Sequence, residues 1–197
     1  MKKTILKNIT VVAVAILTTL GAASCKKETT SGTKLIDKGE VTLGNGDGKA
    51  TYPTYLGFTG NGQIQTWMSV STSDEATQAK VDLTFPSVTN PIICGPSEGD
   101  FYSGYNCVGW SRRKSCAIKY LGSGFDKTAF NNVTTVEQVK QKFDDGISNN
   151  WLTYSQGSAL AIKTFDGVYA IVYVNETNGS GNSDDHAYLK LLIKVQP

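Results

Sequence analysis

The stretch that decides the fold is AIKTFDGVYAIVYV, residues 161–174. Two runs of apolar and β-branched residues flank Asp166-Gly167, a dipeptide that supplies the positive φ angles of a tight type I′ turn. The stretch therefore predicts a β-hairpin. In its second run, residues 168–174, nearly every position is apolar or aromatic, which is typical of a strand covered on both faces. We expect this strand at the centre of a sheet, with residues 188–195 returning beside it across the loop 175–186.

The rest of the chain after residue 35 repeats this alternation of short β-type runs and turns rich in Gly, Asn, Ser and Asp. The pattern predicts a mainly β domain, built as an antiparallel β-sandwich or a partly closed β-barrel. The strand candidates are residues 40–43, 50–58, 64–70, 79–85, 91–94, 117–121, 159–165, 168–174 and 187–195.

One stretch has a helical pattern. Thr134 and Glu137 have the spacing of a capping box, and Gly146 can end the helix. We expect one short helix packed on the sheet and, because no internal linker is visible, a single domain over residues 35–197. The residues that form the apolar face of the helix, at i, i+3 and i+7, are Val136, Val139 and Phe143.

The N-terminus has the layout of an export signal. Three lysines precede an apolar run at residues 9–20, which is too short to span a bilayer, and small residues then lead to Cys25. Residues 1–24 are therefore expected to be a signal peptide. Residues 25–34 contain no apolar side chain that could pack and are expected to form a flexible tether.

Ala22-Ala23-Ser24-Cys25 resembles the lipobox of bacterial lipoproteins, with Ala22 where leucine is usual. The resemblance implies cleavage before Cys25 and acylation of its thiol, which anchors a protein to a membrane without spanning it. The Lys-Lys-Glu that follows Cys25 resembles the export tags of surface lipoproteins, and no aspartate follows the cysteine. The expected location is the outer membrane, lipid-anchored, at the cell surface of a Gram-negative bacterium.

Removal of the signal changes the charge balance. The chain has 19 Lys+Arg against 17 Asp+Glu, a formal net charge of +2, but removing the three signal lysines leaves 16 against 17. The only arginines are the adjacent Arg112 and Arg113. A nucleic-acid-binding protein needs clustered excess positive charge, so we expect no nucleic-acid partner.

Three cysteines remain after Cys25, namely Cys94, Cys107 and Cys116. In an oxidising compartment the simplest count is one disulfide and one thiol. A bridge between Cys107 and Cys116 would close a small loop that exposes Trp110 beside a basic run. Two alternatives stay open: Cys94 is one of the paired residues, or all three are buried small hydrophobes. No Cys-x-x-Cys occurs and no histidine is near in sequence, so no metal site is expected.

His186 is the only histidine of the chain. A Ser-His-Asp or Cys-His site would have to use it, and no Gly-x-Ser-x-Gly motif is present, so we predict no catalytic residues. Glycoside hydrolysis needs only two carboxylates, which leaves a small carbohydrate-active enzyme as an alternative.

Several aromatic residues fall outside the strongest strand patterns. Tyrosine and tryptophan in loops offer flat, amphipathic surfaces that suit sugars, porphyrins or protein partners, and they are also ordinary rim and core residues. Those residues are Trp67, Tyr102, Tyr105, Trp110 and Trp151; Tyr102, Tyr105 and Trp110 are candidate ligand-binding residues.

The Cys25 lipobox with its polar tether, the stretch AKVDLTF at residues 79–85 and the terminal block quoted above together resemble the HmuY-like haem-binding surface lipoproteins. The resemblance implies a mostly β fold with a ligand-capturing end and, in the haem carriers, two axial ligands drawn from His and Met. After the signal, this chain offers only His186 and Met68. Haem is therefore a candidate cofactor and these two residues are candidate ligands, although Met68 in its strand-like run also suits core filling.

The leading interpretation is a non-enzymatic, lipid-anchored binding lipoprotein. Its expected partners are the membrane, through the N-terminal lipid, and an outer-membrane transporter or surface complex. The alternatives are a glycan- or partner-binding surface around Trp110 and residues 112–114, a structural component of the cell envelope, and a small carbohydrate-active enzyme.

Overall fold

The computed structural model describes residues 32–44, 51–85, 92–98, 107–149, 151–153, 155–179 and 186–197. Gly32–Pro197 forms one compact unit. The predicted signal peptide, Cys25 and the predicted tether up to residue 31 lie outside the described residues, as do Tyr102 and Tyr105.

The secondary structure of this unit is mainly β. Its helices are α1 (Glu75–Gln78), α2 (Lys127–Asn132) and α3 (Val136–Asp145). Its strands are β1 (Ile36–Gly44), β2 (Tyr55–Phe58), β3 (Ile64–Trp67), β4 (Leu83–Thr84), β5 (Ile92–Cys94), β6 (Cys116–Tyr120), β7 (Ile147–Asn149), β8 (Trp151–Thr153), β9 (Ala159–Thr164), β10 (Tyr169–Asn178) and β11 (Tyr188–Val195).

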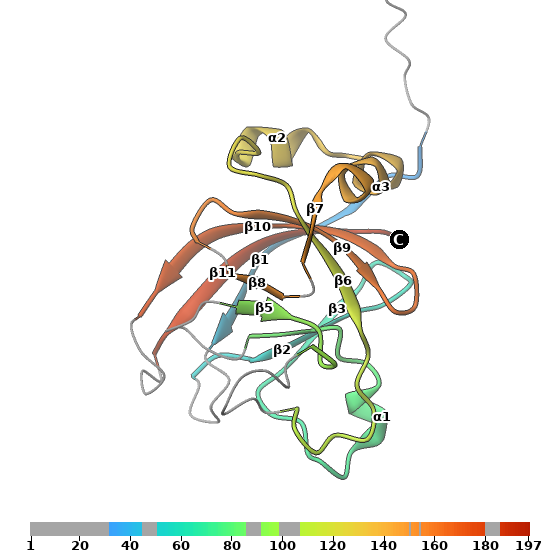
Figure 1. Cartoon of the computed structure of the whole chain (residues 1–197), viewed down its shortest axis with the longest axis vertical. Helices are drawn as coiled ribbons and strands as arrows, with labels where there is room; N and C mark the ends of the chain where they lie inside the picture. Colours follow the sequence, from blue (N-terminus) through green and yellow to red (C-terminus); the bar gives the residue numbers. More distant parts are fainter. Residues whose placement is uncertain are drawn as a thin grey trace, which may run out of the picture. The chain divides into compact units, whose positions relative to one another are not determined.

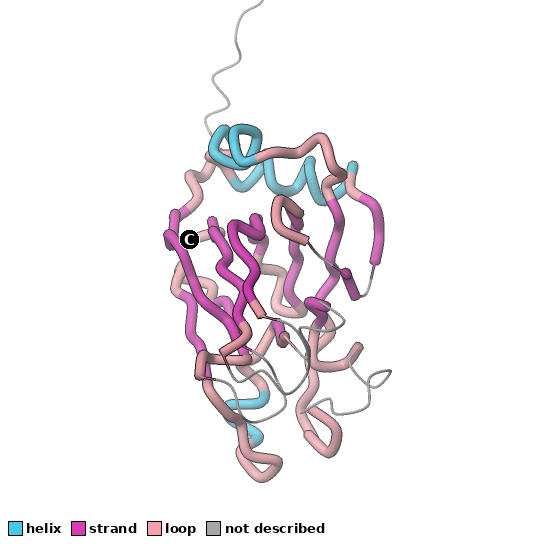
Figure 2. The backbone as a smooth tube through the Cα atoms, turned by 90° about the vertical axis from the view of Figure 1, so that its left-hand side faces the viewer, coloured by secondary structure: helices cyan, strands magenta, loops and turns pink. Residues whose placement is uncertain are grey.

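The strands form two antiparallel sheets that pack face to face (Figure 1). One sheet has six strands in the order β1-β11-β10-β9-β6-β7, and the other has five in the order β3-β2-β4-β5-β8. Helices α2 and α3 cover the outer face of the six-stranded sheet, and α1 lies on the far side of the domain (Figures 1 and 2). The predicted β-sandwich is confirmed, and its described strands do not close into a barrel.

Every strand candidate from the sequence overlaps an observed strand, but the prediction of a single helix is wrong. α1 has four residues and α2 has six, which is too short to produce a helical repeat of apolar positions. An aspartate caps each of these helices: Asp74 accepts a hydrogen bond from the Thr77 N–H, and Asp126 accepts one from the Ala129 N–H. None of the helices within the described ranges has the length and apolar character needed to cross a bilayer.

β10 lies inside the six-stranded sheet and is covered on both faces, as predicted. Because side chains alternate along a strand, Ala170, Val172 and Val174 pack into the core between the sheets. Ile171 packs on the opposite face against residues of the helix layer. The continuous apolar run in the sequence therefore reflects two cores, one on each side of the sheet.

The predicted β9–β10 hairpin is present, but its turn is not of type I′. Among the described residues only glycines have positive φ, and in this turn Gly167 alone does, at 82°. The Thr164 N–H donates to the Val168 carbonyl at 2.9 Å, which closes a three-residue loop. A three-residue loop needs one left-handed position and not two, so Asp166 keeps an ordinary φ.

The capping box of α3 is shifted by one residue from its predicted position. Thr135 is the N-cap, and its hydroxyl accepts a hydrogen bond from the Gln138 N–H at 3.3 Å. In return, the Gln138 side chain accepts from the Thr135 N–H at 3.0 Å. The prediction that paired Thr134 with Glu137 is wrong because Gln138 has an equally suitable side chain one position later. Gly146 ends the helix as predicted, in an extended conformation.

The domain begins before residue 35, which was its predicted first residue. The Thr33 carbonyl accepts from the Val136 N–H at 2.9 Å, and the Leu35 N–H donates to the Thr134 carbonyl at 2.9 Å. The last residues of the predicted tether are therefore hydrogen-bonded to the start of α3.

A buried lysine joins the C-terminal strand to the helix layer. Lys194 of β11 is 7% exposed, and its ammonium group donates to three backbone carbonyls at the end of α2. Burial lowers the pKa of Lys194, while the carbonyl dipoles replace the water that the cation has lost. The acceptors are the carbonyl oxygens of Phe130 at 3.1 Å, Asn131 at 2.9 Å and Val133 at 2.9 Å.

Candidate functional site

The structure does not place Trp110 on an exposed loop. Its indole is 4% exposed and packs against Tyr55, with ring centroids 5.2 Å apart. The prediction of an exposed aromatic knuckle is wrong because the outer face of the five-stranded sheet is apolar and Trp110 covers it. Arg112 remains exposed, with Nε 3.4 Å from Oε2 of Glu75.

The predicted bridge between Cys107 and Cys116 is absent. The Cys116 side chain lies in the core between the sheets, whereas Cys107 packs with Cys94 and Trp110 on the outer side of the five-stranded sheet. A disulfide needs Cβ atoms about 3.5–4.5 Å apart, which these separate locations do not allow. All three cysteines are buried, as in the second of the two alternatives, and burial raises the pKa of the Cys116 thiol well above its usual range.

His186 and Met68 are both exposed, Met68 by 50%. The core-filling interpretation of Met68 is therefore wrong. Nδ1 of His186 lies 3.5 Å from Oγ1 of Thr51, and Met68 directly follows β3. Both residues lie at the end of the sandwich where β1 and β3 finish and β11 begins. There Gly44, the last residue of β1, pairs with Tyr188, the first residue of β11. The Gly44 N–H also donates to the Pro53 carbonyl, and the Thr54 N–H donates to the carbonyl of Trp67, the last residue of β3.

The described residues include no cluster of His, Cys, Asp and Glu side chains that could hold a metal ion. The candidate haem ligands therefore have to be judged by the pocket around them. Neither His186 nor Met68 lines any of the four pockets described below.

The opposite end of the sandwich contains a buried ion pair that the sequence did not predict. Nζ of Lys114 lies 3.1 Å from Oδ1 of Asp82 and 2.8 Å from Oδ2 of Asp166. The exposed fractions of the side chains are 14% for Lys114, 1% for Asp82 and 61% for Asp166. Oδ2 of Asp82 also accepts from the Phe58 N–H at 2.7 Å, which fixes the carboxylate at the end of β2.

Burial raises the pKa of the Asp82 carboxyl, although the Phe58 N–H and the positive charge of Lys114 partly offset this effect. For Lys114, burial opposes the charged form, but the hydrogen bond to Asp166 and the attraction of Asp82 together outweigh it and raise the pKa. The lysine is thus protonated at neutral pH and held between two carboxylates.

This ion pair borders a cavity of about 290 Å³, which we call the Lys114 pocket. Its walls come from β2 and β3, from the segment after α1 and from the β9–β10 hairpin. These elements place both hydrogen-bond donors and acceptors around one hollow. The polar and glycine residues that line it are Gly57, Thr59, Gly60, Gln65, Lys80, Lys114 and Asp166.

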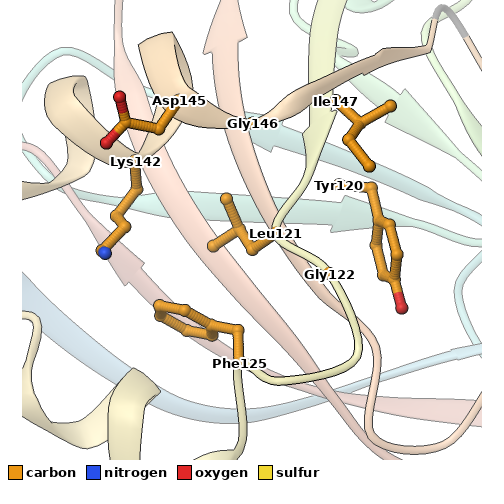
Figure 3. Close-up of a pocket in the computed structure, with 8 residues that line it drawn as sticks. All are labelled: Tyr120, Leu121, Gly122, Phe125, Lys142, Asp145, Gly146 and Ile147. Atoms are coloured by element: carbon orange, nitrogen blue, oxygen red, sulfur yellow. The ribbon is translucent and has the colours of Figure 1, made fainter.

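A second pocket of about 280 Å³ lies beside α3 and is more apolar (Figure 3). Phe125 and Leu121 line it together with Ile147, which is 61% exposed, and Nζ of Lys142 lies 5.7 Å from the centroid of the Phe125 ring. Two further hollows, of about 430 and 450 Å³, flank the α2–α3 connection. The pocket beside α3 offers apolar contact area with one lysine and one aspartate at its rim, and no buried charge.

Comparison with known proteins gives no assignment: no protein-family model, no curated protein and no solved structure matches this chain.

The sequence contains one signal for the ion pair. Asp82 stands between Val81 and Leu83, and a charged residue inside an apolar strand run predicts a buried partner. The partner could not be found the same way, because Lys114 belongs to a basic run predicted to be exposed. Asp166 was interpreted only as a turn residue.

Proposed function

We propose that this protein is a lipid-anchored, non-enzymatic binding lipoprotein of a Gram-negative outer membrane, and that its ligand occupies the Lys114 pocket. Anchoring rests on the N-terminal sequence, in which small residues lead to Cys25. Ligand binding rests on the charged group held at the wall of the pocket.

Lys114 is the observation that supports a binding role. A buried ion pair is a weak source of stability, because desolvation of both charges opposes their attraction. Such a pair is useful where a polar wall must keep a fixed geometry before the ligand arrives, since a preorganised site loses less entropy on binding. The Lys114 ammonium group, restrained by Asp82 and Asp166, provides such a wall.

The proposal names no haem and no catalytic group. His186 and Met68 are exposed away from the Lys114 pocket, and the single histidine of the chain leaves no Ser-His-Asp or Cys-His site near the pocket. The membrane, reached through the acylated Cys25, is the proposed partner.

Metabolic labelling with an alkyne fatty acid tests the anchoring. The wild-type chain should acquire the label and fractionate with outer membranes, and Cys25→Ser should abolish both properties. Ser24→Ala is the matched control, because it keeps a small residue before the cysteine and should be labelled as the wild type is. Label retained in Cys25→Ser, or absent from the wild type, would overturn the anchored form of the proposal.

A further inference from the structure

We propose that the Lys114 pocket binds one residue of a neutral glycan, with Trp67 as the aromatic surface beside the sugar ring. This inference rests on the proposed function and specifies the ligand class for the same pocket.

The first observation is that Trp67, which packs against the outer apolar cluster and is not itself a lining residue, lies next to Gly57, one of the residues that line the pocket. Gly57 of β2 pairs with Gln65 of β3, and residues two apart on a strand share a face, so Gln65 and Trp67 project from the same side. A Cβ atom on Gly57 would lie 3.1 Å from Cη2 and Cζ3 of Trp67 and 2.1 Å from the Lys80 carbonyl oxygen. The six-membered ring of the partly exposed indole therefore lies over Gly57, a residue that lines the pocket.

The second observation is the mixture of donors and acceptors around that ring. Gln65 offers both kinds of group, Lys80 donates and Asp166 accepts, and all three side chains are exposed at the rim. Sugar hydroxyls donate and accept at once, and the C–H face of a sugar ring packs on aromatic rings. A flat aromatic surface bordered by such groups suits a pyranose.

The third observation is the charge balance of the pocket. Lys80 and Lys114 contribute two positive charges, and Asp166 and the adjoining Asp82 contribute two negative ones. A phosphate or carboxylate ligand needs donors whose charge is not already compensated. Lys114 lies between two carboxylates, so an uncharged ligand is favoured over an anionic one.

The size of the pocket limits how much of a glycan it can hold. Its volume of about 290 Å³ is at the lower end of the range of about 300–1,000 Å³ typical of ligand sites. One sugar residue fits this volume, and the exposed rim leaves room for the rest of a chain to continue into solvent.

The inference is tested first by side-chain removal. The purified protein is applied to an array of neutral and anionic glycans, and each glycan bound is then titrated by calorimetry. We expect binding to a neutral glycan, weakened about tenfold or more by Gln65→Ala and by Trp67→Ala, a change of about 1.4 kcal/mol or more. Thr66→Ala is the matched control, because Thr66 is exposed on the opposite face of β3 and should bind as the wild type does.

The second test adds a side chain at the wall of the pocket, at a position where the backbone leaves room for one. Neither Gly60 nor Gly124 has a positive φ, and a Cβ atom on either would meet no atom within 4 Å. Gly60→Leu adds a side chain to the Lys114 pocket and should abolish glycan binding. Gly124→Leu, which adds the same side chain to a hollow beside α2, should leave it unchanged.

The outcomes separate this inference from the proposed function. Glycan binding that survives Gly60→Leu, or selective binding of anionic glycans, would overturn the neutral-sugar site. If no glycan binds but another ligand raises the melting temperature, and Gly60→Leu abolishes that shift, the binding function stands and the glycan is wrong. If Gly60→Leu changes the binding of no ligand that the protein binds, both the proposed glycan ligand and the assignment of the Lys114 pocket as the ligand site are wrong.

Discussion

Asp82 directly precedes β4, and its side chain is almost completely removed from solvent. Burial opposes its ionised form there, and the Phe58 N–H and the positive charge of Lys114 favour it. The carboxylate therefore links the end of β2 to the segment before β6, two parts of the chain that are far apart in sequence. Its titration should be visible in the stability of the whole domain.

We expect Asp82→Asn to change how stability depends on pH. Because burial raises the pKa of Asp82 in the folded state, the folded protein binds its proton more tightly than the unfolded chain does. The contribution of Asp82 to stability is therefore greatest below the unfolded pKa of about 3.9 and is lost as the pH rises through the folded value. The free energy of unfolding of wild type minus that of Asp82→Asn should fall as the pH rises from 4 towards neutrality, measured by urea denaturation.

Glu176→Gln provides a control of opposite sign. The hydrogen bonds from Lys190 and Tyr188 lower the pKa of Glu176, so its contribution is present above the unfolded pKa and is lost as the pH falls. The free energy of unfolding of wild type minus that of Glu176→Gln should rise with pH. If the corresponding difference for Asp82→Asn also rose with pH, the raised pKa assigned to Asp82 would be wrong.

Single residues are also where prediction from sequence was weakest. Trp110 and Cys116 were expected in one exposed loop, yet both are buried, in different cores. A tryptophan or cysteine near basic residues can lie on either side of a sheet edge, and only long-range packing decides which. Asp82 was predictable as a buried charge from its apolar neighbours, but its partner Lys114 was not, since 31 intervening residues had to fold first.

At the scale of elements, local signals were sufficient for α3 and for the β9–β10 hairpin. Both are specified by residues close in sequence: an apolar face of i, i+3, i+7 spacing for the helix, and a glycine between two β-type runs for the hairpin. The helix cap differs from the prediction by one position because Thr134 and Thr135 both suit a helix cap. The distinction depends on which hydroxyl reaches a backbone N–H in the folded chain.

We expect Thr135→Ala to destabilise the protein by about 1 kcal/mol, because it leaves the Gln138 N–H without its acceptor. Thr135→Ser keeps the hydroxyl and should recover most of the loss. The control Thr134→Ala changes an exposed residue and should stay within about 0.5 kcal/mol of wild type. The free energy of unfolding of each variant is measured by thermal or urea denaturation. If Thr134→Ala lost more stability than Thr135→Ala, Thr134 would be the N-cap, as predicted from the sequence.

At the scale of the whole molecule, the sequence predicted an antiparallel β-sandwich or a partly closed β-barrel with one helix packed on the sheet, and it could not predict which loops meet. The continuous apolar run of β10 indicated a strand with a core on each side, which the helix layer and the second sheet provide. The Lys114 pocket, by contrast, is assembled from β2, β3, the segment after α1 and the β9–β10 hairpin. The hydrophobic periodicity of one segment predicts its secondary structure and does not predict which other segments it meets.

A haemin titration tests the placement of the candidate haem ligands in the folded molecule. Because the proposed ligand site is the Lys114 pocket, which neither His186 nor Met68 lines, we expect no Soret shift that depends on either residue. The titration is followed in oxidised and reduced states for the wild type, His186→Ala and Met68→Ala. A shifted Soret band in the wild type that is lost in either variant would contradict this expectation and make the protein a haem carrier.

The pairing of β1 with β11 has a mechanical consequence. The chain enters the domain at residues 33–35 and continues into β1, which runs antiparallel to β11 from Ile36 opposite Val195 to Gly44 opposite Tyr188. A tension applied to the preceding chain along the axis of β1 would load these hydrogen bonds together, in shear, and not one after another as in unzipping. Lys194 would pass part of that load from β11 to the end of α2. A domain held by its N-terminus against flow would thus resist the pull through the whole β1–β11 set of hydrogen bonds at once.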